Sequence, residues 1–367
     1  MRQPAHGGNL AWAAALAGCP PDAILDFSAS ISPLGPPNSA LAAIKSQIGN
    51  LKHYPDPNYS ELRLALSHFH HLPSEWILPG NGSAELLTLI GRELAQLAAT
   101  ILITPAFGDY YRTLSAYNAN VLECPLINSE QRVLLAEAGR LVRAELPVVL
   151  STQHSALSTH WGLLLNNPHN PTGKLFTRDS ILPYLEQFAL VVVDEAFMDF
   201  VPPNEEQSLI PVVQEYPNLV VLRSLTKFYS LPGLRLGYAI AHPDCLAKWQ
   251  LWRDPWPVNT LAAAAAIAAL QDTEFQQQTW AWLPPARNQL FQGLAEIPGL
   301  QPQASATNFL LVESQESTSQ LQQQLLKYHQ ILIRDCLSFK ELGDRFFRVA
   351  VREESDNQRL LTALKES

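Results

Sequence analysis

Short apolar runs alternate with helix-like segments through the middle of this 367-residue chain, and this alternation constrains its fold more than any other feature. Runs rich in Val, Ile and Leu that end at turn residues are typical of strands buried on both faces. Helical patterns lie between them, for example at residues 84–98 and 177–188. This order predicts an α/β protein with a mostly parallel sheet between helices. The expected strands are residues 100–104, 161–165, 189–193, 219–222 and 236–241.

The character of the sequence changes after about residue 250. Residues 261–270 and 280–294 look helical, whereas residues 308–312 and 345–351 look like strands. We therefore expect a second, smaller α+β domain. The expected division is a large domain at residues 45–250 and a small domain formed by residues 1–44 together with residues 251–367.

Charge and composition exclude several classes of protein. With 25 basic and 34 acidic residues the net charge is −9, which disfavours nucleic-acid binding because that needs a basic surface. No apolar run approaches the roughly 18 residues that span a bilayer, so we expect no membrane partner. Residues 10–17 superficially resemble a signal peptide, but no basic segment precedes them, and we expect a helix there. The four scattered cysteines lack metal-ligand spacing, which predicts free thiols in a reducing cytoplasm and no metal site.

Polar motifs follow several of the expected strands. Taken alone, each has an ordinary interpretation as a helix cap, a run of turns or a solvated lysine. Their order is more informative, because ligands gather at the carboxyl ends of parallel strands. The motifs are GNGSAE at residues 80–85, NNPHNPTGK at 166–174, VVVDEAF at 191–197, SLTK at 224–227 and GLRLG at 233–237.

In this order the motifs resemble those of the fold-type I pyridoxal-phosphate enzymes, the aspartate aminotransferase superfamily. The chain looks closest to the branch that holds histidinol-phosphate aminotransferase and L-threonine-O-3-phosphate decarboxylase, from about residue 6 to residue 352. The resemblance implies that pyridoxal 5'-phosphate is the cofactor and that Lys227 holds its aldehyde as a Schiff base. Burial and the neighbouring cation of Arg235 would depress the pKa of that lysine. Asp194 would stabilise the protonated ring nitrogen.

The resemblance implies further contacts to the cofactor. Asn170 would donate a hydrogen bond to the phenolic oxygen of the ring, and Tyr110 would stack on the ring. The cofactor phosphate would lie at a helix N-terminus, where the helix dipole favours anions. Tyr54 would reach the phosphate of the neighbouring subunit, which implies a homodimer with shared active sites. The residues expected around the phosphate are Ser83, Ala84, Ser224, Thr226 and Arg235.

A second set of matches implies a small phosphorylated amino acid as substrate. Arg348 matches the arginine that pairs with the substrate carboxylate, and Arg352 is a weaker match. The segment HGGN at residues 6–9 would fold over the site and help bind the substrate phosphate. Ser30 stands where this branch usually has an asparagine. The expected substrate-binding residues are His6, Gly7, Gly8, Asn9, Ser30, Asn170, Arg348 and Arg352.

The reaction depends on which bond at the substrate Cα is held perpendicular to the cofactor ring, and the protein selects it by placing the carboxylate. Aminotransferases of this branch carry a tyrosine in Asp-Glu-Ala-Tyr, but Phe197 stands there in this chain. The resemblance therefore favours decarboxylation of L-threonine O-3-phosphate to (R)-1-amino-2-propanol O-2-phosphate and CO₂, in cobalamin biosynthesis. The alternative is an aminotransferase that acts on histidinol phosphate and 2-oxoglutarate. A non-catalytic regulator on this fold is a third possibility, which the absence of a basic DNA-binding module disfavours.

Overall fold

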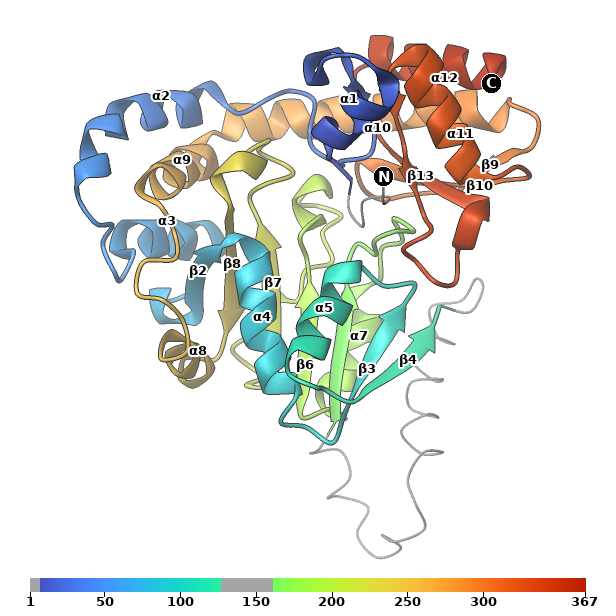
Figure 1. Ribbon diagram of the computed structural model, residues 1–367. Helices are drawn as coiled ribbons and strands as arrows, with labels where there is room; N and C mark the ends of the chain where they lie inside the picture. The colour runs from blue at the N-terminus through green and yellow to red at the C-terminus, as the bar shows by residue number, and fades with distance from the viewer. Residues whose placement is uncertain (1–6, 127–160) are drawn as a thin grey trace, which may run out of the picture.

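A seven-stranded sheet lies at the centre of the computed structural model, which describes residues 7–126 and 161–367 (Figure 1). The strand order is β2-β8-β7-β6-β5-β3-β4. Strand β8 runs antiparallel to both of its neighbours, and the other strand pairs are parallel. The predicted mostly parallel sheet is thus confirmed. The strands are β2 (Ile77–Asn81), β3 (Ala99–Thr104), β4 (Val121–Pro125), β5 (Trp161–Asn166), β6 (Leu190–Asp194), β7 (Leu219–Ser224) and β8 (Leu236–Ala241).

Each of the strands predicted from the apolar runs is present, but the two edge strands β2 and β4 were not predicted. Strand β2 has the sequence ILPGN, in which Pro and Gly weaken the strand signal. Strand β4 has the sequence VLECP and is less buried than the central strands, because within residues 7–126 and 161–367 it pairs with a strand on one side only. Edge strands carry fewer buried apolar residues, so an apolar run marks them poorly.

Helices cover both faces of this sheet (Figure 1). Helices α4 (Gly82–Leu94) and α5 (Gly108–Ala116) pack on one face together with α8 (Pro243–Gln250), and Val192 of β6 points into this layer. Val191 and Val193 of the same strand point into the core on the other face, which includes α7 (Arg178–Leu185). Side chains of a strand alternate between the two faces, so burial on both sides explains the continuous apolar runs.

A second lobe contains an antiparallel four-stranded sheet with the order β12-β13-β10-β9. The first helix and strand of the chain join this lobe, because β1 (Leu25–Asp26) pairs in parallel with β11 (Ile331–Leu332). The expected smaller α+β region is therefore present, and the boundaries at residues 44 and 250 stay a prediction. Its other elements are α1 (Leu10–Ala17), β9 (Leu300–Pro302), β10 (Phe309–Ser314), α11 (Thr318–Gln324), β12 (Arg334–Asp335), β13 (Phe346–Ala350) and α12 (Glu354–Glu366).

The remaining helices connect these parts. Helix α9 (Thr260–Gln271) packs against α2 (Asn38–Gln47) and α3 (Ser60–His70), at the left of Figure 1. The long helix α10 (Thr273–Ala295) begins earlier than predicted, because the side chain of Asp272 accepts a hydrogen bond from the backbone of Phe275 and caps it.

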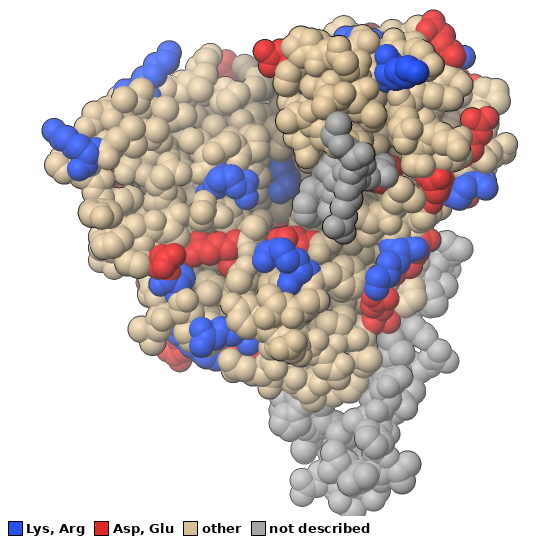
Figure 2. All heavy atoms as spheres, viewed as in Figure 1, with Lys and Arg blue, Asp and Glu red and all other residues tan. Residues whose placement is uncertain are grey.

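The charges on the surface and the hydropathy of the helices can be compared with the expectations from composition. On the face shown in Figure 2, basic and acidic side chains are interspersed and do not gather in one basic patch. None of the helices in residues 7–126 and 161–367 has both the length and the apolar character needed to cross a membrane.

Candidate active site

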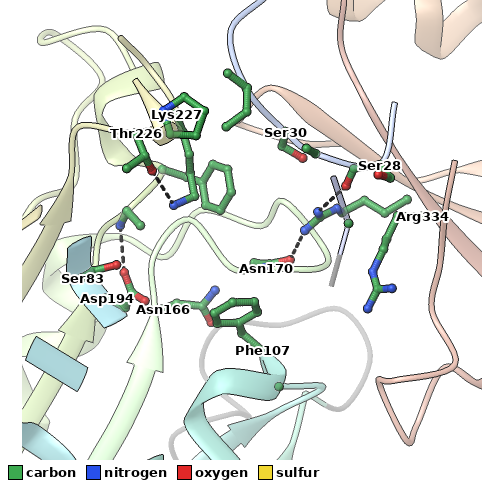
Figure 3. Close-up of a pocket in the computed structure, with 18 of the residues that line it drawn as sticks. Ser28, Ser30, Ser83, Phe107, Asn166, Asn170, Asp194, Thr226, Lys227 and Arg334 are labelled. Atoms are coloured by element: carbon green, nitrogen blue, oxygen red, sulfur yellow. Dashed lines mark hydrogen bonds between the residues drawn. The ribbon is translucent and has the colours of Figure 1, made fainter. Parts of the chain in front are cut away.

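A cavity of about 320 Å³ lies between the carboxyl ends of the central strands and the second lobe. Figure 3 shows Lys227, Asp194 and Ser83 on one side of this cavity, Arg334 on the other side, and Asn170 between them. The structure therefore brings together residues that are far apart in the sequence. Other residues that line the cavity are Gly7, Ser28, Ser30, Phe107, Tyr110, Asn166, Phe197, Thr226, Arg235, Ser338, Phe339 and Arg348.

Lys227 follows strand β7, and its amine points into the cavity (Figure 3). Its Nζ lies 3.4 Å from Ser224 Oγ and 3.5 Å from Thr226 Oγ1. Burial lowers the pKa of Lys227 to about 8, the charge of Asp194 opposes this shift, and the charge of Arg235 adds to it. An appreciable fraction of this amine is neutral near pH 8, and only the neutral amine is a nucleophile.

Asp194 ends strand β6 and is 6% exposed. Its Oδ2 accepts a hydrogen bond of 2.8 Å from the hydroxyl of Tyr110, and its Oδ1 accepts one of 3.0 Å from the backbone of Ala196. Burial raises the pKa of this carboxyl, while the charge of Lys227 and the two hydrogen bonds lower it. The carboxylate is thus held in one orientation in a site where a positive group would be stabilised.

The N-terminus of α4 forms a cradle for an anion. Gly82 begins this helix with a φ of +73°, and a Cβ on it would lie 2.6 Å from Arg235 Nη2. Ser83 follows in the first turn and lines the cavity. Free backbone N–H groups, the helix dipole and a guanidinium together favour a phosphate. Ser224 and Thr226 bond to each other at 2.8 Å beside Lys227, and Ala84 lies in the same first turn as Ser83 without lining the cavity.

Two buried arginines face the cavity from the second lobe. Arg334 of β12 and Arg348 of β13 are directly opposite each other in the antiparallel register. Arg348 donates from Nη1 to Asn170 Oδ1 and from Nη2 to the carbonyl of Ser28 at 3.3 Å, and Arg334 donates from Nη2 to Ser338 Oγ at 2.6 Å. Like charges directly opposite on paired strands repel each other. Burial and then the charge of Arg334 lower the pKa of Arg348 to about 10.

Arg334 was not predicted from the sequence. The signal that could have found it is its position in ILIRD, because an arginine within an apolar strand is rarely buried without an anionic partner. Phe107, Asn166 and Ser338 also line the cavity and were not predicted. The ring of Phe107 packs edge-on against that of Tyr110, with ring centroids 5.7 Å apart.

The segment after residue 6 lies against the second lobe and contributes Gly7 to the cavity. A Cβ on Gly7 would lie 2.3 Å from the carbonyl oxygen of Ser28, so only glycine fits there. The backbone N–H of Gly8 donates to Ser28 Oγ at 2.8 Å, and Asn9 caps α1 by accepting from Trp12 at 3.0 Å. His6, which was predicted to bind substrate, lies outside the described residues.

Three further predicted residues have distinct environments. Ser30 lines the cavity, and its buried hydroxyl has no hydrogen-bond partner within the described residues. Arg352 does not line the cavity, because its Nε pairs with Asp356 at 2.8 Å. Tyr54 is 78% exposed, lies outside the cavity of its own chain, and stacks on Trp256 with ring centroids 4.4 Å apart.

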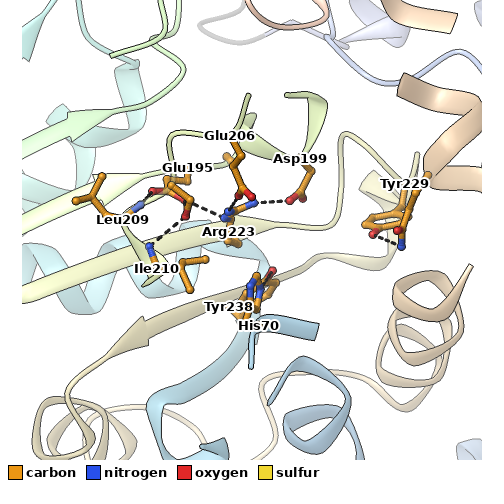
Figure 4. A network of polar contacts seen from close by, with 12 residues as sticks. His70, Glu195, Asp199, Glu206, Leu209, Ile210, Arg223, Tyr229 and Tyr238 are labelled. Carbon is orange, nitrogen blue, oxygen red and sulfur yellow. Dashed lines mark hydrogen bonds and ion pairs between the residues drawn. The ribbon is translucent and has the colours of Figure 1, made fainter. Parts of the chain in front are cut away.

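A cluster of charged side chains surrounds Arg223, which directly precedes the site residue Ser224 (Figure 4). Arg223 is 2% exposed and pairs with Glu195 at 3.0 Å, with Asp199 at 2.5 Å and with Glu206 at 2.5 Å. Burial raises the pKa of Glu195 to about 7, although Arg223 opposes this shift. Glu195 follows Asp194 and Arg223 precedes Ser224, so the cluster ties together the ends of strands β6 and β7 that carry the site.

The cavity fits the cofactor expected from the sequence: it combines a lysine of lowered pKa, a buried carboxylate and an anion cradle. The chain belongs to the aminotransferase class I and II family, whose model matches residues 22–364. A threonine-phosphate decarboxylase from Salmonella typhimurium is 38% identical over 98% of this chain and 96% of its own length. The adenosylcobalamin biosynthesis bifunctional protein CobDQ from Leptospira interrogans is 30% identical over 99% of this chain and 41% of its own length.

Solved structures of aminotransferases have the same fold as this chain. The histidinol-phosphate aminotransferase from Clostridium acetobutylicum is 28% identical to this chain, with a TM-score of 0.81, and the match covers 94% of this chain and 98% of that chain. The family resemblance and the fold inferred from the motifs are thus confirmed.

Proposed function

We propose that this protein is a pyridoxal-phosphate-dependent decarboxylase that converts L-threonine O-3-phosphate to (R)-1-amino-2-propanol O-2-phosphate and CO₂. The observation that carries the proposal is the pair formed by Arg334 and Arg348 in the cavity of Lys227. Two buried guanidinium groups side by side repel each other, and a small ligand with two anionic groups relieves that repulsion. A phosphorylated amino acid has a carboxylate and a phosphate a few bonds apart.

Five residues would hold the cofactor. When bound, pyridoxal phosphate supplies a carbonyl that an amine can hold covalently and a ring that accepts the electron pair released at Cα. Lys227 provides the amine, and Asp194 provides the negative charge that stabilises a protonated ring nitrogen. Ser83 and Arg235 bind the phosphate at the N-terminus of α4. Tyr110 keeps the Asp194 carboxylate in place through its hydrogen bond.

The second lobe would hold the substrate. Arg348, oriented by Asn170 and Ser28, pairs with the carboxylate, and Arg334 pairs with the phosphate. Gly7 and Ser30 form the adjacent wall of the cavity. Partial burial of the site lowers the local dielectric constant, which strengthens ionic contacts such as these.

Decarboxylation is preferred over transamination for two reasons. Phe197 lies beside the lysine, with Lys227 Nζ 5.2 Å from its ring centroid, and it has no hydroxyl to donate. The relative from Salmonella typhimurium, matched over nearly its whole length, is a threonine-phosphate decarboxylase. The second candidate is histidinol-phosphate aminotransferase. An aminotransferase binds two substrates in turn, and the same two arginines suit both a phosphorylated amine and a dicarboxylic acid.

Two observations bear on the biological context of this reaction. The likeness to an adenosylcobalamin biosynthesis protein supports a role in making cobalamin. Cys19, Cys124, Cys245 and Cys336 form no disulfide bond in the part of the chain that the structure describes, which supports a reducing compartment such as the cytoplasm.

We also propose a homodimer with shared active sites. Tyr54 and Trp256 are exposed, as are Ile48 and Leu51 on the neighbouring turn. Exposed apolar residues gathered in this way mark an interaction surface. A second copy of the chain would cover them and place Tyr54 near the cofactor phosphate of the partner.

The experiment is a substrate test on the cofactor-loaded protein. We expect CO₂ release from O-phospho-L-threonine without any keto acid. Turnover of histidinol phosphate that requires 2-oxoglutarate, with no CO₂ release, would establish the aminotransferase instead. If the protein binds the cofactor at Lys227 but catalyses neither reaction, the remaining hypothesis is the non-catalytic regulator.

A further inference from the structure

The loop between β12 and β13, residues 336–345, closes one side of the cavity. Ser338 and Phe339 line the cavity from this loop. Phe339 is 4% exposed and packs with Cys336 and Leu311. Ser338 Oγ accepts the 2.6 Å hydrogen bond from Arg334 Nη2. The loop therefore supplies one of the contacts that hold the Arg334 guanidinium.

The outer side of the same loop is tied to the large sheet. Lys340 Nζ lies 3.0 Å from Glu123 Oε1, on the edge strand β4. The hydroxyl of Tyr111, on α5, donates to the same oxygen at 2.8 Å. Lys340 Nζ also lies 4.9 Å from the ring centroid of Tyr111. We call these three residues, Tyr111, Glu123 and Lys340, the latch.

The latch joins the two sides of the cavity. Tyr111 directly follows Tyr110, which orients Asp194 on the cofactor side. Lys340 lies two residues after Ser338, which holds Arg334 on the substrate side. A single exposed ion pair contributes little, but here one carboxylate oxygen receives two donors and the ammonium group also lies near an aromatic ring. Hydrogen bonds from Lys340 and then from Tyr111 lower the pKa of Glu123, so the carboxylate stays ionised at neutral pH.

We propose that Tyr111, Glu123 and Lys340 are positioning residues that hold the 336–345 loop over the cavity and thereby fix Arg334 for the phosphate of the substrate. The inference rests on the proposed function, because it takes the ligand of Arg334 to be the phosphate of O-phospho-L-threonine. None of the three residues lines the cavity, so they act through Ser338 and Phe339. Their loss weakens substrate binding and leaves the chemical step unchanged.

The test compares K340M, E123Q and the double variant with a matched control. Lys340 is 69% exposed, so its replacement leaves the core intact. The control is K248M, because Lys248 also pairs with a glutamate, Glu93, at 2.8 Å and lies 4.8 Å from an aromatic centroid, that of Trp252. Lys248 lies on α8, which contacts β2 at the opposite edge of the sheet from β4.

We expect K340M and E123Q to raise KM for O-phospho-L-threonine about three- to tenfold and to change kcat less than about twofold. The double variant should be no worse than the poorer single variant, because both changes break the same contact. The control should keep the KM of the unmodified protein. An unchanged KM in K340M and E123Q, or an equal rise in K248M, would overturn the inference.

A second measurement keeps the inference testable if the unmodified protein does not turn over this substrate. Inorganic phosphate is titrated calorimetrically into the cofactor-loaded protein, and amide hydrogen exchange is followed in the peptide that covers residues 336–345. We expect weaker phosphate binding and faster exchange in K340M than in K248M. Equal behaviour of the two variants refutes the latch, whereas absent turnover together with a difference between them refutes only the proposed function.

Discussion

Tyr110 donates its phenolic hydroxyl to Asp194 Oδ2 at 2.8 Å, in a fully buried contact between helix α5 and the end of strand β6. The resemblance to known enzymes assigns Tyr110 to stacking on the cofactor ring. The hydrogen bond indicates an additional role in orienting the carboxylate. Phe107, three residues earlier, also lines the cavity and is a second candidate for the stacking contact.

The first prediction follows from that contact. Tyr110→Phe keeps the ring but removes a hydrogen bond to a charged group, which contributes about 1.5–3 kcal/mol. We expect kcat to fall about tenfold or more while the cofactor stays bound, since the pKa of Asp194 rises further when the donor is lost. Steady-state kinetics and the visible absorption of the cofactor measure the two effects. An unchanged kcat would mean that the hydrogen bond has no part in catalysis.

The second prediction separates the two arginines. Arg334→Gln should raise KM for O-phospho-L-threonine about 100-fold and should affect the binding of L-threonine much less, because only the former has a phosphate. Arg348→Gln should weaken the binding of both compounds. Arg359→Gln, at an exposed residue whose partner is the carbonyl of His329, serves as the control. Equal losses for both compounds in Arg334→Gln would remove that arginine from the phosphate site.

The third prediction concerns the glycine at the cavity wall. Gly7→Ala places a methyl group 2.3 Å from the carbonyl oxygen of Ser28, so the segment must move away. We expect a higher KM with an unchanged melting temperature, because the segment is short and lies at the surface. Gly49→Ala is the control, since a Cβ there meets no atom within 4 Å. A native KM in Gly7→Ala would separate this segment from substrate binding.

The fourth prediction is a pH dependence of the cofactor-free protein. Folding lowers the pKa of Lys227 from 10.5 to about 8, so between these values the unfolded chain binds more protons than the folded one. The free energy of unfolding therefore gains a contribution that increases with pH across this window. Lys227→Met lacks this contribution. Urea unfolding of both proteins, at the same protein concentration and from pH 7 to pH 10.5, gives the free energy of unfolding of each at every pH. If the two free energies change with pH in parallel, the lowered pKa of Lys227 is contradicted.

The fifth prediction tests the shared site. Lys227→Ala removes the amine, and Tyr54→Ala removes the residue expected to reach the phosphate site of the partner. Mixing the two inactive variants after unfolding and refolding should restore about a quarter of the native activity, because half of the dimers are mixed and one site of each is complete. No recovery, in a mixture shown to contain mixed dimers, would place Tyr54 outside the site of the partner.

The sequence predicted the parts of the fold that depend on local patterns. Continuous apolar runs marked the central strands, and the motifs after them placed Lys227, Asp194 and Asn170 in one cavity. The edge strand β4 was not predicted, because partial burial leaves no continuous apolar run. Arg334 was not predicted either, since its place opposite Arg348 depends on the pairing of β12 with β13.

The pairing of β1 with β11 has a consequence for how the protein folds during translation. These strands come from opposite ends of the chain, and the two cavity arginines of the second lobe, Arg334 and Arg348, lie after β11. A ribosome releases the chain from its N-terminus, and domains fold as they emerge. The mostly parallel sheet can therefore form early. Strand β1, in contrast, cannot pair until β11 has been synthesised near the end of translation. A nascent or truncated chain that ends before residue 331 holds the amine of Lys227 but no arginine pair.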